Sequence, residues 1–95
     1  MARRHKLDII AEILELCKGG SKKTRLVYQA NINFSMLVKY TKLLEKKSFI
    51  YTMNDHIYTT QEGLEFLRQY EMMRIAWDFN EETEKMRAEE LTRIL

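Results

Sequence analysis

The chain of 95 residues has no proline, one cysteine and three glycines. A lone cysteine, Cys17, excludes a disulfide within the chain, and it excludes a metal site built on several thiolates of one chain. Without proline, helices can run uninterrupted. No stretch approaches the roughly 20 apolar residues of a membrane-spanning helix, so we expect no membrane partner.

Charge divides the chain into two halves. Residues 1–50 carry eleven Lys and Arg against four acids, whereas residues 51–95 carry five bases against ten acids. The halves therefore have net charges of +7 and −5 within a total of +2. A basic half joined to an acidic half indicates a basic working surface and a tail with another task, although chance segregation is an alternative in a short chain.

Residues 7–18 have the apolar spacing of a helix whose inner face includes Ile13 and Cys17. We expect Cys17 to be a buried apolar group rather than a reactive thiol. Gly19 and Gly20 follow, and one of them should take the left-handed conformation that ends a helix.

A short second helix is predicted from Lys22 to about Ala30, with Ser21 as its N-cap. Lys22, Lys23 and Arg25 cluster at its start, where cations oppose the helix dipole. A phosphate docked on the free backbone N–H groups would reverse this penalty. Simple solubility is the alternative explanation.

A third helix is predicted to begin after Asn33 as N-cap and to end near Lys47, with a core-facing stripe and a cationic outer face. The core-facing stripe comprises Phe34, Leu37, Thr41 and Leu44. The outer stripe comprises Ser35, Lys39, Lys42 and Lys46. Two helices joined by about three residues, the second basic outside, are typical of a helix-turn-helix. A surface helix with solvated lysines is the alternative.

Alternating strand-forming residues at 49–59 enclose Asn54-Asp55, a pair that suits a tight turn. They predict a β-hairpin directly after the basic helix. The order helix, helix, basic helix and hairpin indicates a mainly α winged helix-turn-helix domain over residues 1–63.

The last helix is predicted to run from about Gln61 to Leu95, with Thr60 as N-cap and Gly63 packed closely against the hairpin. It would be roughly 50 Å long, and residues 72–79 are apolar on most sides. We therefore expect residues 64–95 to form a homodimeric coiled coil, which the seam alone allows to be parallel or antiparallel. The expected interface residues are Tyr70, Met73, Trp77, Asn80, Glu84, Arg87, Leu91 and Ile94.

Four segments carry a resemblance to a known family: LDIIAEILELCKGG at 7–20, KTRLVYQAN at 23–31, KYTKLLE at 39–45 and TTQEG at 59–63. With them, the chain resembles the small archaeal winged-helix DNA-binding proteins that dimerise through a C-terminal antiparallel coiled coil. The resemblance implies a homodimer that binds duplex DNA. Asp55 departs from it, because DNA contact at a wing tip would favour Lys or Arg.

We therefore expect a double-stranded DNA-binding protein that is cytoplasmic and nucleoid-associated, needs no cofactor or metal, and serves in chromatin or in transcriptional regulation. Phosphate contacts are expected from Arg3, Arg4, Lys6, Lys22, Lys23 and Arg25. Major-groove contacts are expected from Ser35, Lys39, Tyr40 and Lys42. Asn54 and His56 would bring the hairpin near the DNA backbone.

Two other function classes compete with this reading. A protein-interaction adaptor without DNA binding would use the acidic helix, and it would tolerate Lys39→Glu combined with Lys42→Glu. An enzyme is not expected, because the two histidines, His5 in the N-terminal arm and His56 near a turn, have no local nucleophile or carboxylate arrangement.

Overall fold

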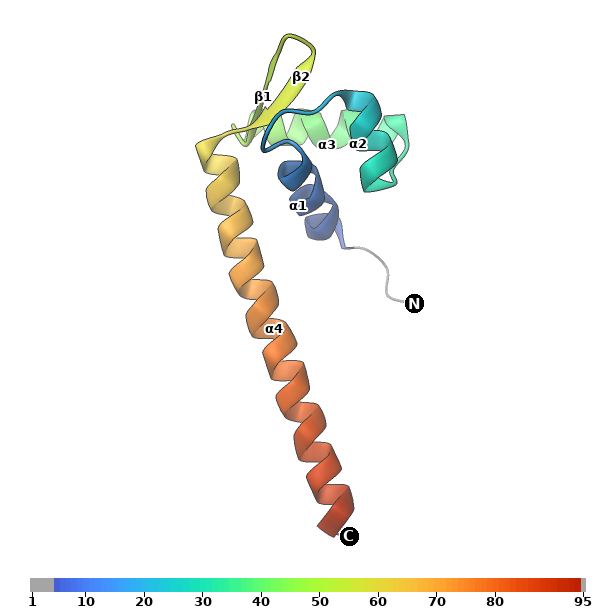
Figure 1. Ribbon diagram of the computed structural model, residues 1–95, viewed down its shortest axis with the longest axis vertical. Coiled ribbons are helices and arrows are strands. Elements are labelled where there is room, and N and C mark those ends of the chain that lie inside the picture. Colours follow the sequence, from blue (N-terminus) through green and yellow to red (C-terminus); the bar gives the residue numbers. More distant parts are fainter. Residues whose placement is uncertain (1–4, 95) are drawn as a thin grey trace.

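The computed structural model describes the backbone of residues 5–94 and the side chains of residues 5–77. Its elements follow the predicted order: α1 (Lys6–Leu16), α2 (Lys23–Ala30), α3 (Phe34–Lys46), β1 (Ile50–Met53), β2 (His56–Thr59) and α4 (Gln61–Ile94). Figure 1 shows the first three helices and the hairpin gathered at one end of α4, which extends away from them. We call residues 5–60 the winged body.

The core of the winged body draws on every element. The largest of the almost fully buried side chains are Ile13, Leu14, Cys17, Ser21, Leu26, Leu37, Leu44 and Ile57. From α4, Leu67 is buried as well, so the first turns of this helix complete the core. Burial raises the pKa of the Cys17 thiol to about 12, which keeps it protonated and confirms the prediction of an apolar role.

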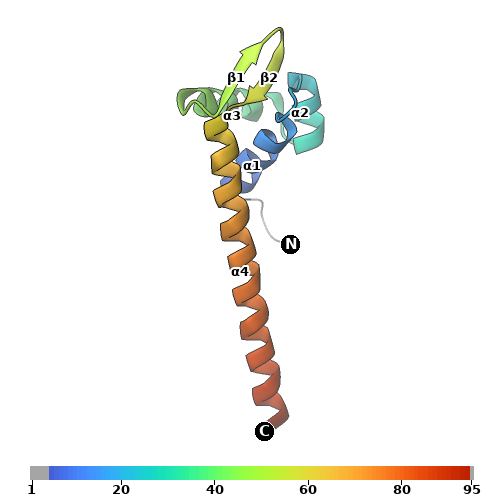
Figure 2. The same cartoon turned by 60° about the vertical axis from the view of Figure 1, so that its left-hand side comes forward.

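The hairpin has the predicted position and turn. Strands β1 and β2 pair antiparallel, with Ile50 opposite Thr59 and Met53 opposite His56. Asn54 and Asp55 both have positive φ, at 50° and 63°, which is the geometry of a two-residue type I′ turn. The turn end of the hairpin therefore projects as a wing on the side away from α4 (Figure 2), while at its base Thr59 of β2 contacts α1.

Ser21 has a different role from the one predicted. Its N–H donates to the carbonyl of Ile57 at 2.9 Å, and its carbonyl accepts from the Ile57 N–H at 2.8 Å. Ser21 thus adds a bridge to the wing, and the N-cap of α2 is Lys22, which makes no side-chain capping hydrogen bond. Gly20 has positive φ (+91°) as predicted, but it does not end the helix: α1 ends at Leu16 with Cys17 as its C-cap, and Gly20 leads into this bridge.

The junction between the wing and α4 confirms two sequence predictions. Thr60 caps α4, since its Oγ1 accepts from the Gly63 N–H at 3.1 Å. A Cβ at Gly63 would overlap the carbonyl oxygen of Phe49, so glycine permits the close approach. No helix in the described part of the chain is long and apolar enough to cross a membrane.

Candidate nucleic-acid interface

Helix α3 separates an apolar face from a cationic one. Asn33 caps it as predicted, with Oδ1 accepting from the Met36 N–H at 2.7 Å. The buried residues of the helix are Leu37, Tyr40, Thr41 and Leu44. The exposed stripe, which we call the cationic face, is Ser35, Lys39, Lys42 and Lys46. Thr41 fits the core because its hydroxyl donates to the Leu37 carbonyl at 2.9 Å.

The burial of two aromatic residues of α3 is the reverse of the prediction. Phe34 was expected in the core, but its side chain is 60% exposed, because the buried part of the helix begins only at Leu37. Tyr40 was expected in the major groove, but it is 8% exposed and belongs to the core. Its position between Leu37 and Leu44 on the apolar side turns the ring inward, so Tyr40 is removed from the candidate DNA contacts.

The start of α2 is a second cluster of exposed cations. Lys22, Lys23 and Arg25 are all exposed, and the first turn of α2 contains no acidic residue. The terminal N–H groups of α2 therefore have no capping side chain. This end of α2 and the wing border a groove of about 350 Å³, whose lining residues are Lys22, Lys23, Thr24, Thr52, Asp55 and Ile57.

At the tip of the wing, Asn54 and Asp55 are exposed and His56 is half-buried. His56 Nδ1 lies 2.9 Å from the carbonyl oxygen of Asn54. A carbonyl only accepts, so Nδ1 carries the hydrogen and a neutral His56 ring keeps Nε2 as an acceptor. The wing thus presents one amide and one imidazole, and Asp55 adds a negative charge beside the cations of α2.

The N-terminal arm is shorter than predicted. His5 is the N-cap of α1: its Nδ1 accepts from the Leu7 N–H at 3.1 Å, and Asp8 accepts from the His5 N–H at 3.0 Å. Lys6 is exposed at the start of the helix, and Arg3 and Arg4 lie outside the described residues. A carboxylate three residues after a cap is the sequence signal for this capping box, and histidine in the cap position concealed it.

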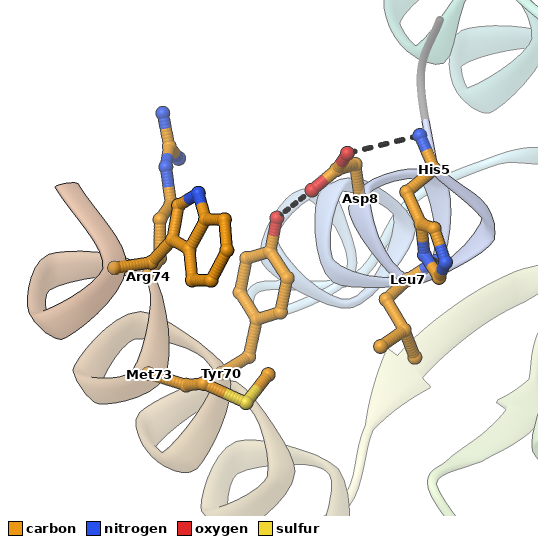
Figure 3. A pocket seen from close by; sticks show the side chains of 7 residues that line it. His5, Leu7, Asp8, Tyr70, Met73 and Arg74 are labelled. Carbon is orange, nitrogen blue, oxygen red and sulfur yellow. Dashed lines mark hydrogen bonds between the residues drawn. The ribbon is translucent and has the colours of Figure 1, made fainter. Parts of the chain in front are cut away.

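Asp8, the carboxylate of this capping box, also joins α1 to α4. Tyr70 points from α4 to α1, where its hydroxyl donates to the carboxylate of Asp8 (Figure 3). This hydrogen bond is the main reason why the pKa of Asp8 is lowered, and it raises the pKa of Tyr70 to about 12. Beside it lies a pocket of about 260 Å³, whose other walls are His5, Leu7, Met73, Arg74 and Trp77.

Beyond this contact, α4 exposes large apolar side chains. The exposed fractions are 58% for Met72, 59% for Met73, and 65% for both Ile75 and Trp77. Of the expected dimer interface, Met73 and Trp77 lie in this stretch, whereas Tyr70 precedes it and contacts Asp8 of α1. The side chains of Asn80, Glu84, Arg87, Leu91 and Ile94 lie outside the described residues. Among the described residues, no group of three His, Cys, Asp or Glu could hold a metal ion.

Comparison with known proteins gives matches of two kinds. Residues 3–76 match the family described as winged helix-turn-helix. The structure is similar to the crystal structure of Sso10a-2, a DNA-binding protein from Sulfolobus solfataricus, with a TM-score of 0.71 and 28% sequence identity. That similarity covers 87% of this chain and 93% of the other. A search of curated protein sequences gives no match. The family match spans most of the chain and agrees with the observed elements: the chain belongs to the winged helix-turn-helix family.

Proposed function

We propose that the protein binds double-stranded DNA as a homodimer, with α3 as the recognition helix in the major groove. The cationic face of α3 carries this proposal. It presents Ser35 and three lysines to solvent, while the opposite side of the same helix is packed into the core. A helix-turn-helix places its second helix in the major groove in this way. The similar structure of Sso10a-2, a DNA-binding protein, supports the same function.

Phosphate contacts would come from the start of α2. Lys22, Lys23 and Arg25 offer positive charge beside backbone N–H groups that no side chain caps. A phosphate there would neutralise the charge cluster and accept from the free donors. Lys6, at the start of α1, would add a further contact, together with Arg3 and Arg4.

Recognition of bases would be weak. Ser35, Lys39 and Lys42 remain as groove contacts once Tyr40 is assigned to the core. Lysine binds phosphates and base edges without the fixed fork of arginine, so binding would tolerate many sequences. Asn54 and His56 would approach the DNA backbone from the wing. Asp55 opposes a deep entry of the wing tip into the minor groove, whose potential is strongly negative.

Dimerisation would use α4. Met72, Met73, Ile75 and Trp77 are more than half exposed, and a helix with such side chains on most sides needs a second surface. The seam continues in the sequence through Asn80, Glu84, Arg87, Leu91 and Ile94. An antiparallel pair of α4 helices would bring Glu84 of one chain near Arg87 of the other. Residues 1–63 would then bind DNA and residues 64–95 would join the subunits.

On this proposal the protein is cytoplasmic and nucleoid-associated, acts in chromatin organisation or transcriptional regulation, and needs neither a cofactor nor a catalytic group. An adaptor that binds other proteins is the competing function, and the exposed apolar residues of α4 are the observation that favours it.

Charge reversal on the cationic face distinguishes the two functions. The variant combining Lys39→Glu and Lys42→Glu should lose at least about tenfold in affinity for a random-sequence duplex, because two cations per subunit that face the DNA become acids. Fluorescence anisotropy of a labelled duplex measures this loss. The matched control combines Lys18→Glu and Arg68→Glu, which changes the net charge equally but in the turn after α1 and in α4.

Equal affinities of the two variants would mean that net charge alone drives binding, which would contradict the assignment of α3. Unchanged binding in both variants, or no binding by the wild type at low salt, would reject the DNA proposal and favour the adaptor. Circular dichroism of each variant checks that the fold is retained.

A further inference from the structure

Phe34 is an aromatic side chain that the winged body leaves in solvent. It is the first residue of α3, directly after the Asn33 cap, and 60% of it is exposed. Its burial on binding would remove apolar surface from water, which is favourable. The other aromatic residue of α3, Tyr40, is in the core. Phe34 is therefore the aromatic group that α3 can offer to a ligand.

The position of Phe34 at the N-terminal end of α3 points to a ligand that also reaches the cationic face. Ser35, the next residue, belongs to that face, and Lys39 lies about one and a half turns farther along, whereas the first turn of α3 contains no acidic residue. Figures 1 and 2 show that α3 begins beside α2 and runs toward the base of the hairpin. The first turn thus lies at the end of the winged body away from α4, where a second copy paired along α4 would not cover it.

Base edges in the major groove are mostly polar. Their apolar feature is the C5 methyl group of thymine, which phenylalanine and other apolar side chains contact. In a helix-turn-helix, the N-terminal residues of the recognition helix reach the base edges. Phe34 combines this position with the required chemistry, whereas the lysines of the cationic face favour phosphates and guanine.

We propose that Phe34 packs against the C5 methyl group of thymine and gives the protein a preference for thymine in the major groove. This inference rests on the proposed DNA binding through α3 and adds a specificity-determining residue to it. The contact buries one methyl group per subunit, which corresponds to about a fourfold gain in affinity for each contact.

The test removes the methyl group from the DNA and the ring from the protein. One probe is a labelled duplex of A·T pairs only, and its partner is the same duplex with every thymine replaced by deoxyuracil. Wild-type protein should bind the thymine duplex at least about fourfold more tightly. Phe34→Ala should bind both duplexes with nearly equal affinity, because the apolar partner of the methyl group is gone.

A second pair of probes separates the methyl group from duplex shape. A duplex of G·C pairs is compared with the same duplex carrying 5-methylcytosine, which places a methyl group at the same position of the pyrimidine. Methylation should raise the affinity of the wild type and leave that of Phe34→Ala unchanged. Phe34→Leu retains an apolar side chain and should keep part of the discrimination, whereas Met53→Ala, at an exposed residue of the wing, should keep all of it.

The outcomes distinguish this inference from the proposed function. If the wild type binds all four duplexes but discriminates neither pair, DNA binding stands and the thymine contact is rejected. If Phe34→Ala weakens binding to all duplexes equally, Phe34 contacts DNA without reading the methyl group, which also rejects it. If the wild type binds none of the duplexes, the proposed function itself fails. Because Phe34 is exposed, thermal unfolding of Phe34→Ala should match that of the wild type.

Discussion

The winged body and the part of α4 beyond Tyr70 differ in how far they bury their apolar side chains. In the winged body, apolar residues from α1, α2, α3 and the hairpin close around one another, and α4 adds Leu67 to this core. Farther along α4, Met72, Met73, Ile75 and Trp77 are 58% to 65% exposed. The winged body thus buries its core with its own residues and exposes large apolar side chains on three different elements, at Tyr28, Phe34, Tyr51 and Met53. Helix α4 instead gathers four of them within residues 72–77, the stretch for which we propose a partner.

The polar side chains of the two regions also differ in burial. Among the described residues, no buried side-chain nitrogen or oxygen lacks a hydrogen-bond partner. Thr59, for example, is partly buried and donates to the Leu14 carbonyl at 2.6 Å, which ties β2 to α1. On α4, by contrast, the Glu65–Arg68 ion pair at 2.6 Å is exposed and contributes little to stability.

The largest effect is expected in the core of the winged body. Leu37→Ala removes a side chain that is 1% exposed, so the free energy of unfolding should fall by about 3 kcal/mol. Urea unfolding at one fixed protein concentration measures this loss, because the stability of a dimer depends on concentration. A loss below about 1 kcal/mol would mean that the core around α3 is loosely packed, which would contradict the contrast between the two regions.

A smaller effect, on assembly rather than on folding, is expected from α4. Trp77→Ala should raise the dissociation constant of the homodimer about 30-fold, since large buried aromatic residues dominate interfaces. Sedimentation equilibrium measures the constant. Met53→Ala, which truncates an equally apolar but isolated residue of the wing, should leave the constant unchanged. A monomeric wild type would remove the partner that α4 is proposed to require.

The smallest effect is expected at the contact between the two regions. Tyr70→Phe removes the hydrogen bond to Asp8, and the cost should stay below about 1 kcal/mol because the pair is accessible to solvent. Tyr28→Phe, at a tyrosine that is 85% exposed, is the matched control and should have no effect.

The loss caused by Tyr70→Phe should depend on pH in both directions. The folded pKa of Asp8 is lowered, so the stabilising contribution is present at neutral pH and disappears as the pH falls through that value. The folded pKa of Tyr70 is raised to about 12, so the contribution is complete below about pH 10 and is lost as the pH rises toward 12. A constant difference in melting temperature between wild type and variant across this range would contradict the assigned contact.

Much of the fold follows from local patterns in the sequence. The first helix, the cap at Asn33, the Asn54-Asp55 turn and the cap at Thr60 are all confirmed by the structure, although the first helix spans Lys6–Leu16 rather than residues 7–18. Each of these features depends on residues close together in the chain, so single-sequence reasoning captures it. The exposure of Ser35, Lys39, Lys42 and Lys46 is confirmed for the same reason, because one helix period places them on one side.

The missed features depend on residues that are distant in the chain. Ser21 pairs with Ile57, so its role as a bridge became visible only once the hairpin was placed beside it. The apolar spacing of α3 included Phe34, but spacing does not show where the core ends along a helix axis. Tyr40 has an apolar ring and a polar hydroxyl, so its chemistry allows it to face either water or the core. In the structure it packs in the core.

The most direct test of the central claim is the salt dependence of duplex binding, measured by fluorescence anisotropy with a labelled random-sequence duplex. If each subunit neutralises about four phosphates, the plot of log affinity against log salt concentration should have a slope of roughly −7. The combination of Lys39→Gln and Lys42→Gln should make this slope less steep, because fewer counterions are released. A shallow slope for the wild type, or the same slope for both proteins, would contradict DNA binding through the cationic face of α3.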